Sequence, residues 1–151
     1  MAERGNKSVA YFVNKRTTKP WILDSGASDH MTGDASNFSE FHMSTGNQTV
    51  KIADGTLSKV EGVGSVIINK DLTLTSVLYV PKLDCNLLSI SKFTRDHHCV
   101  TKFFSNLCVF QDLDSGKRIG SAEMYSGLYV LRNETQSTST TQKFSLLSLN
   151  N

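Results

Sequence analysis

The chain has 151 residues, of which 38% are hydrophobic and 20% charged, and this composition is typical of one folded globular domain. Its formal net charge of +2 is too small to indicate a nucleic-acid or membrane partner. No apolar run approaches the roughly 18 residues of a membrane span, and the polar start has no secretory signal, so an intracellular location is expected.

The first strand signal of the central part is Pro20–Asp24, an apolar run that ends at Asp-Ser-Gly and predicts a buried strand entering a tight loop. Residues 1–19 before it are predicted to form a polar extension with one β-prone run, Val9–Val13. The segment Ser36–Met43, with two phenylalanines on one side and Ser36 as N-cap, predicts a short helix.

Strand signals dominate the next part of the chain. Three strands are predicted there: Val50–Ile52, Leu57–Ile68 and Leu72–Val80. The dipeptide Asp54-Gly55 predicts a two-residue hairpin turn between the first two. Gly62 and Gly64 allow a bend or bulge in the second.

The best helix signal is Asn86–Asp96, where four apolar residues fall on one face and Asp84 or Asn86 is available as a cap. Four short strands separated by turn signals are predicted after it: Cys99–Phe104, Leu107–Gln111, Lys117–Ser121 and Leu128–Leu131. Residues 133–151 begin with nine residues of which none is apolar, and are expected to be a disordered tail or linker. The predicted fold is mainly β, with one late helix.

The three cysteines, Cys85, Cys99 and Cys108, have no C-x-x-C spacing, and the four histidines show no matching rhythm. A zinc site needs about four ligands. The cluster His97-His98-Cys99 is a poor ligand set, because neighbours in sequence cannot all point at one ion from a regular element. We therefore expect this cluster at a helix end or strand start, free buried or half-buried thiols, and no metal.

The residues that carry chemistry are Trp21-Ile22-Leu23-Asp24-Ser25-Gly26. Apolar residues bring the Asp24 carboxylate to the end of a buried strand, where an unpaired charge would be costly. Ser25 can hydrogen-bond this carboxylate, and Gly26 lets backbone N–H groups approach it. An aspartic protease needs this arrangement twice, because its two carboxylates share one proton and act as base and acid. The purely structural alternative is a strand that ends in a capped turn.

A second Asp-Ser-Gly, at Asp114-Ser115-Gly116, lies among charged residues between two short β runs and is expected to be a solvated hairpin turn. Too little chain follows it to build a second lobe. With Asp24 as the one usable aspartate, a dyad requires a symmetric homodimer with the two Asp24 carboxylates on its two-fold axis.

Three motifs carry a resemblance to a known family. They are WILDSGASDHMTG from Trp21, VKIADGT from Val50 and VLYVPKLDCNLLSISKF from Val77. In this order, over about Trp21–Leu131, they resemble the protease region of plant copia-type Gag-Pol polyproteins. The resemblance implies a retropepsin-like acid-protease fold in residues 20–132, with closed β-barrel-like sheets, a flap hairpin and one late helix, active as a homodimer.

The resemblance also implies roles for particular residues. Asp24 would be the catalytic aspartate, with Ser25 and Gly26 completing its loop. The hairpin Val50–Glu61 would be the flap that closes on a peptide, and Leu87-Leu88-Ser89 would pack behind the catalytic loop. Substrate contacts are expected from Ala27, Ser28, Asp29, Ala53, Asp54, Gly55 and Thr56. For Asp29 and for His30, loop capping is an equal alternative to a place in a substrate subsite.

The expected function is an aspartic endopeptidase that cleaves its own Gag-Pol polyprotein without metal or cofactor, in the cytoplasmic virus-like particle of a retrotransposon. Nucleic acid and membrane are not expected partners of this domain. One alternative is a domesticated, non-catalytic binding or scaffold module with the same fold. Another is a hydrolase that uses Ser25 or Ser28, although Gly26-Ala27-Ser28-Asp29-His30 lacks the last glycine of G-x-S-x-G.

Overall fold

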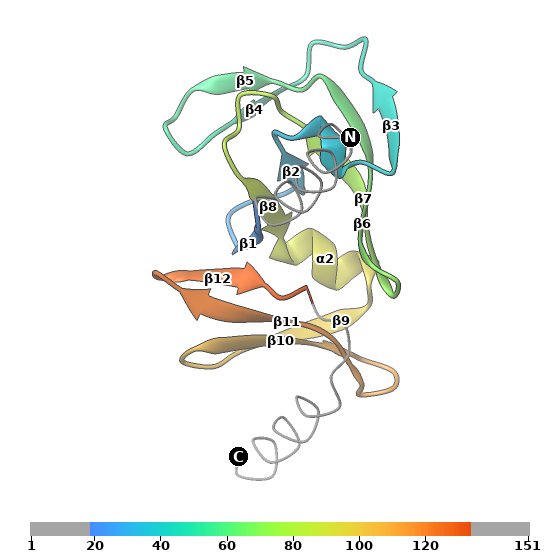
Figure 1. Ribbon diagram of the computed structural model, residues 1–151, viewed down its shortest axis with the longest axis vertical. Coiled ribbons are helices and arrows are strands. Elements are labelled where there is room, and N and C mark those ends of the chain that lie inside the picture. Colours follow the sequence, from blue (N-terminus) through green and yellow to red (C-terminus); the bar gives the residue numbers. More distant parts are fainter. Residues whose placement is uncertain (1–18, 134–151) are drawn as a thin grey trace, which may run out of the picture.

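The computed structural model of the chain describes residues 19–133, which are mainly β with one α-helix (Figure 1). The strands are β1 Trp21–Asp24, β2 Met31–Thr32, β3 Glu40–Met43, β4 Thr49–Lys51, β5 Leu57–Lys59, β6 Gly62–Asn69, β7 Leu72–Tyr79, β8 Asn86–Ser89, β9 Cys99–Phe103, β10 Leu107–Asp112, β11 Arg118–Tyr125 and β12 Leu128–Leu131. The helix α2 is Ile90–Asp96, and Ala35–Asn37 form one 3-10 turn, η1. No helix in this part is long and apolar enough to cross a membrane. The predicted strand Val9–Val13 and the predicted tail beyond residue 133 lie outside the described residues.

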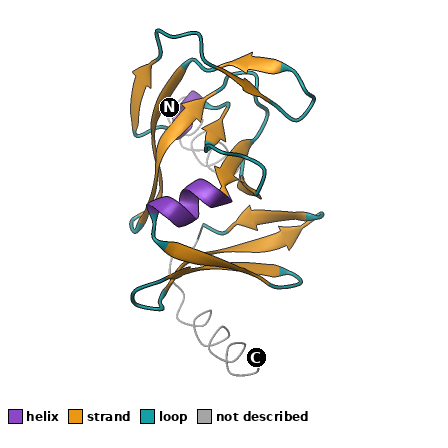
Figure 2. Cartoon of the chain, turned by 180° about the vertical axis from the view of Figure 1, so that it is seen from behind, coloured by secondary structure: helices purple, strands orange, loops and turns teal. Residues whose placement is uncertain are grey.

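Ten strands form one sheet, in the order β3-β6-β7-β2-β8-β1-β12-β11-β10-β9, while β4 and β5 pair only with each other. Two of the pairings are parallel, β1 with β8 and β2 with β7. The order ends at β3 and β9, and within residues 19–133 no pairing joins these two strands, so the expected closed barrel is not shown. Both views place α2 between the strands β9–β12 and the rest of the sheet (Figure 1 and Figure 2).

The main core surrounds helix α2. Phe93 of the helix is fully buried, and its ring centroid lies 4.4 Å from that of Phe110 on β10. Leu74 of β7 and Leu88 of β8 belong to the same fully buried cluster. Burying an apolar side chain of this size contributes about 1.5–3 kcal/mol relative to leaving it exposed. The core around the helix therefore joins strands that lie far apart in the sheet order, β7 and β8 with β10.

The predicted strand Leu57–Ile68 is two strands. Residues of β5 pair with β4, whereas β6 begins at Gly62 and pairs with β3 and β7. The register of β6 against β7 shifts between Gly64 and Val66, so the predicted bulge is confirmed. The other predicted strands are confirmed within about two residues, except that β11 continues to Tyr125.

The predicted helix Ser36–Met43 is wrong. Asp34 caps only the short turn η1, with its Oδ1 accepting the backbone N–H of Ser36 at 2.9 Å. The chain then extends into β3, which pairs with β6. The two phenylalanines pack with Tyr79 of β7 instead of forming a helix face, with ring centroids 5.1 to 6.1 Å apart.

The predicted helix Asn86–Asp96 is confirmed only from Ile90 onward. Residues 86–89 form β8, because their backbone pairs with β1 in parallel and with β2 antiparallel. The buried Asn86 side chain accepts a 2.6 Å hydrogen bond from Thr32 and donates one of 2.7 Å to the Lys19 carbonyl. The helix N-cap is Ser89, whose hydroxyl accepts the Lys92 N–H, and neither Asp84 nor Asn86 has this role.

Candidate active site

Asp24 is the last residue of β1, and its register partner on the parallel strand β8 is Ser89. The half-buried Asp24 carboxylate accepts a 2.8 Å hydrogen bond from the backbone N–H of Gly26 to Oδ1. A Cβ at position 26 would lie 3.3 Å from this oxygen, so the glycine makes room for the contact. The predicted approach of a backbone N–H to the Asp24 carboxylate at Gly26 is therefore observed, while a catalytic role of Gly26 stays a prediction. Ser25 is exposed, and in residues 19–133 no hydrogen bond joins its side chain to Asp24.

The residues after Gly26 alternate in exposure. Ala27 is buried, and its carbonyl accepts a 2.7 Å hydrogen bond from the Ser89 hydroxyl. Ser28 is exposed and donates to the half-buried Asp29 carboxylate at 3.3 Å. The contact with Ala27 confirms that Leu87-Leu88-Ser89 packs behind the Asp24 loop, which is defined here as residues 24–27.

His30 lies in the core and has no exposed surface. Its Nδ1 accepts a 3.0 Å hydrogen bond from the Ser89 N–H, while its buried Nε2 has no hydrogen-bond partner within the described residues. Burial, and then the charge of Lys92, lower the pKa of His30 to about 4, so the ring is neutral at pH 7. Of the two alternatives for His30, the structure supports a contact within the protein over a place in a substrate subsite.

The second group of predicted residues, Ala53–Thr56, forms the exposed tip of the β4–β5 hairpin. The turn is longer than the predicted two residues: Gly55 N–H bonds to the Ile52 carbonyl, and Ile52 N–H bonds to the Thr56 carbonyl. Gly55 takes a left-handed φ of +85°, which a side chain disfavours, and one such residue at the end of the loop is typical of three-residue hairpin loops. Asp54 accepts two hydrogen bonds from Thr56, of 2.8 and 2.6 Å, and these lower its pKa.

The structure brings the Asp24 loop and Ser89 into contact but does not join them to the hairpin tip. The hairpin lies at the upper left of Figure 1, and β1 lies below it on the same side. Within the described residues no hydrogen bond connects residues 53–56 with residues 24–29. The two groups of predicted residues are therefore separate elements in this conformation.

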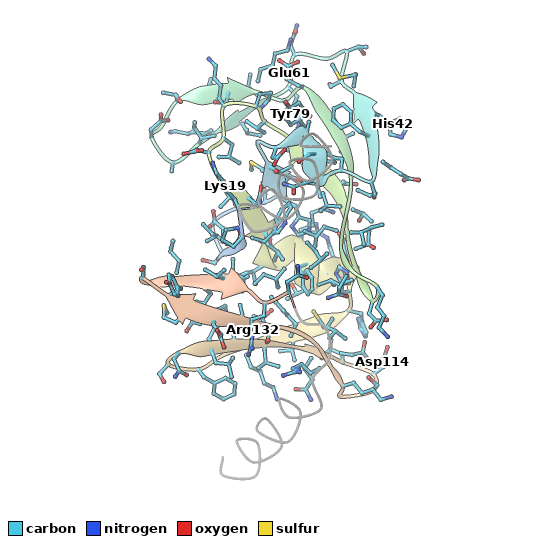
Figure 3. All side chains as sticks on the ribbon, in the orientation of Figure 1. Lys19, His42, Glu61, Tyr79, Asp114 and Arg132 are labelled. Atoms are coloured by element: carbon cyan, nitrogen blue, oxygen red, sulfur yellow. The ribbon has the colours of Figure 1, made fainter. Side chains whose placement is uncertain are left out.

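The second Asp-Ser-Gly is a turn, as predicted. Asp114 lies at the tip of the β10–β11 hairpin, where its side chain is 82% exposed (Figure 3). Asp112 closes the turn by accepting the Ser115 and Gly116 N–H groups at 2.7 and 2.9 Å. Asp114 therefore lies in a solvated turn, without the buried strand that delivers Asp24.

The His97-His98-Cys99 cluster lies between the end of α2 and the start of β9, as predicted. His97 stacks on Phe93 with ring centroids 4.2 Å apart, and His98 faces solvent. Cys99 and Cys108 are buried free thiols, and burial raises their pKa to about 11 and about 12. The prediction of free thiols is confirmed, and the described residues contain no group of three or more residues suited to hold a metal ion.

Comparison with known proteins shows which family this chain resembles. A family described as "Pol polyprotein, beta-barrel domain" matches residues 21–99, just over half of the chain. The chain is 33% identical over 112 residues to the retrovirus-related Pol polyprotein from transposon RE2 of Arabidopsis thaliana, and 31% identical over 112 residues to that from transposon RE1. Each match covers 72% of this chain and 8% of the relative.

A third relative, a transposon Ty5-1 protein of Saccharomyces cerevisiae, is 39% identical over 70 residues, which are 46% of this chain and 47% of that protein. No solved structure is significantly similar. The chain thus spans a small part of the plant relatives it matches. The residues that match the family, 21–99, include the Asp24 loop, β8 and α2. The chain belongs to the beta-barrel domain family of Pol polyproteins, as a region of a copia-type plant retrotransposon Pol polyprotein.

Proposed function

We propose that this domain is an aspartic endopeptidase with a retropepsin-like fold, whose active site forms when two chains pair and each contributes Asp24. The observation that carries the proposal is the environment of Asp24. A buried strand ends at this carboxylate, and the Gly26 N–H bonds its Oδ1 at 2.8 Å. Its other oxygen, Oδ2, makes no hydrogen bond within the described residues and is available to a water or to a second carboxylate.

The proposed chemistry follows from bringing two such carboxylates together. Two like charges at close range cannot both ionise cheaply, so the pair holds one proton between them. The ionised Asp24 removes a proton from a water, which attacks the scissile carbonyl carbon. The protonated Asp24 of the other chain donates a hydrogen bond to the carbonyl oxygen as negative charge develops there. The leaving amine then takes the proton that the first Asp24 removed from the water as the C–N bond breaks, and the pair again holds one proton.

A serine hydrolase that uses Ser25 or Ser28 is a weaker proposal because neither has a histidine base, and a carboxylate is too weak a base to replace one. Ser28 donates to the Asp29 carboxylate at 3.3 Å, but no histidine contacts it in the described part of the chain. The nearby His30 already uses Nδ1 to accept the Ser89 N–H, and its Nε2 is buried. A nucleophilic serine requires a base within hydrogen-bond reach.

We further propose that the substrate is the chain's own Gag-Pol polyprotein, cleaved in a cytoplasmic virus-like particle. In this proposal the β4–β5 hairpin is the flap. Its exposed tip, residues 53–56, and residues 27–29 contact the bound peptide. The tip lies apart from the Asp24 loop in the free chain, and substrate binding requires the two to approach.

The direct test is incubation of the full chain with a Gag-Pol fragment that includes the segments flanking this domain. Wild type should cleave it, and Asp24→Asn, with an amide in place of the ionisable group, should be folded and inactive. Aspartic-protease transition-state mimics should inhibit cleavage, and serine-reactive reagents should not. Binding of the fragment without cleavage by wild type would favour the non-catalytic module.

A further inference from the structure

We propose that neutral His30 is a positioning residue for the Asp24 loop and acts on it through Ser89. The inference rests on the proposed function, in which this loop carries the catalytic carboxylate. Within the described residues no hydrogen bond joins His30 to Asp24. The effect of His30 is exerted through two hydrogen bonds that meet at Ser89.

Ser89 joins three parts of the protein. Its backbone N–H donates to His30 Nδ1 at 3.0 Å, and its hydroxyl donates to the Ala27 carbonyl at 2.7 Å. The same hydroxyl accepts the Lys92 N–H at 3.2 Å and so caps α2. Ser89 is also the register partner of Asp24 in the parallel pair β1–β8. A displacement of Ser89 would therefore be transmitted to both ends of the Asp24 loop.

The hydrogen bond from Ser89 determines the protonation state of the imidazole. A backbone N–H can only donate, so Nδ1 must be unprotonated and the ring hydrogen must lie on Nε2. The buried Nε2 has no hydrogen-bond partner within residues 19–133. A buried donor without a partner is unfavourable, and an apolar side chain would avoid that cost. An apolar residue of similar size could not supply the acceptor that Nδ1 offers to the Ser89 N–H.

The charged groups around His30 favour the neutral ring. Burial and the charges of Lys92 and His97 oppose a proton on it, and only Asp96 favours one. The Lys92 side chain is itself 11% exposed and pairs with Asp96 at 2.7 Å. A second proton on the ring would remove the acceptor for Ser89 and place a positive charge near Lys92.

Two variants separate positioning from simple packing. His30→Leu fills the space but has no acceptor, whereas the amide oxygen of His30→Asn lies where Nδ1 lies and can accept the Ser89 N–H. Phe93→Leu is the control for lost stability, because Phe93 is fully buried in the main core and its apolar ring makes no hydrogen bond to the Asp24 loop. We expect His30→Leu to lower kcat roughly 10- to 100-fold per folded molecule, with KM little changed. His30→Asn should recover most of that loss, and Phe93→Leu should leave kcat unchanged.

A second readout does not depend on cleavage. In ¹⁵N-labelled full chain, the nitrogen shifts of His30 should show Nδ1 unprotonated and Nε2 protonated. The Gly26 and Ala27 amide resonances should move in His30→Leu and return toward wild type in His30→Asn. If wild type cleaves nothing, the proposed function fails and these resonances still decide the positioning role. A proton on Nδ1, unchanged loop resonances in His30→Leu, or equal kcat in His30→Leu and Phe93→Leu would overturn the inference.

Discussion

Among single residues, His30 is a titratable group with no exposed surface, and its pKa of about 4 lies far below its ordinary value of 6.5. Below pH 6.5 the unfolded chain binds a proton at this position and the folded chain does not. Stability is therefore complete above pH 6.5 and is lost progressively as the pH falls toward 4. The hydrogen bond with Lys92 lowers the pKa of Asp96, so protonation of this carboxylate at still lower pH also reduces stability.

The prediction is that the free energy of unfolding falls by roughly 3 kcal/mol between pH 7 and pH 4 because of His30 alone. His30→Asn should show a flatter pH profile, because the amide does not titrate. Urea unfolding at several pH values measures the difference. The control is His42→Asn, the same substitution at an exposed histidine on β3 (Figure 3), which leaves His30 in place and should keep the fall in stability toward pH 4. Parallel profiles for wild type and His30→Asn would contradict the account.

The contact between Gly26 and Asp24 is predictable from the sequence, because the geometry of this loop is local and the two residues bond each other directly. The contact of His30 could not be predicted in the same way. Its partner Ser89 is 59 positions away, and the pairing of β8 with β1 and with β2 brings it there. The dipeptide Asp29-His30 gives no signal that one residue is half-buried and the next fully buried.

At the scale of elements, the β4–β5 hairpin provides a test of the flap. Gly55 has a φ of +85°, and a Cβ added to it would meet no atom within 4 Å, so a side chain there strains the backbone without a clash. Gly55→Val should cost about 1–2 kcal/mol and lower turnover more strongly than thermal stability. The measurement compares kcat/KM with the melting temperature.

The matched control is Gly116→Val, since Gly116 also has a left-handed φ, of +71°, in the turn that contains Asp114. It should show a similar loss of stability with turnover retained. Equal loss of turnover in both variants would mean that strain in any hairpin lowers activity, and the β4–β5 tip would have no special role.

Strands were predicted more reliably than helices, and the two helix errors have one cause. In Asn86–Ser89 the apolar pattern suits a helix, but the parallel pairing with β1 and the buried side chain of Asn86 require an extended backbone. In Phe38–Met43 the pairing with β6 and the aromatic contacts with Tyr79 likewise require an extended backbone. Both depend on tertiary contacts that outweigh local propensity.

At the scale of the whole molecule, the order of the strands was beyond sequence reasoning. Strand β1 lies between β8 and β12, which are its neighbours in space and distant in the chain. The mainly β composition and the late helix were predictable from periodicity and turn residues. Two chains are proposed to share one site because the second Asp-Ser-Gly lies in an exposed turn, which leaves Asp24 as the candidate aspartate of each chain.

The shared site is tested most directly by mixing wild type with Asp24→Asn. At a one-to-one ratio with random pairing, about a quarter of the dimers are wild type and about half are mixed. A mixed dimer holds one carboxylate and one amide and should be nearly inactive. The mixture must be equilibrated where chains exchange, at a total concentration above the dimer dissociation constant.

If the site is shared, the mixture should retain about a quarter of the activity of the same total amount of wild type, by this pairing statistic. The control is wild type mixed with the same amount of an unrelated protein, which should retain the activity of its own chains. Activity of about half in the Asp24→Asn mixture, in proportion to the wild-type chains, would contradict the shared site and would mean that each chain carries a complete one.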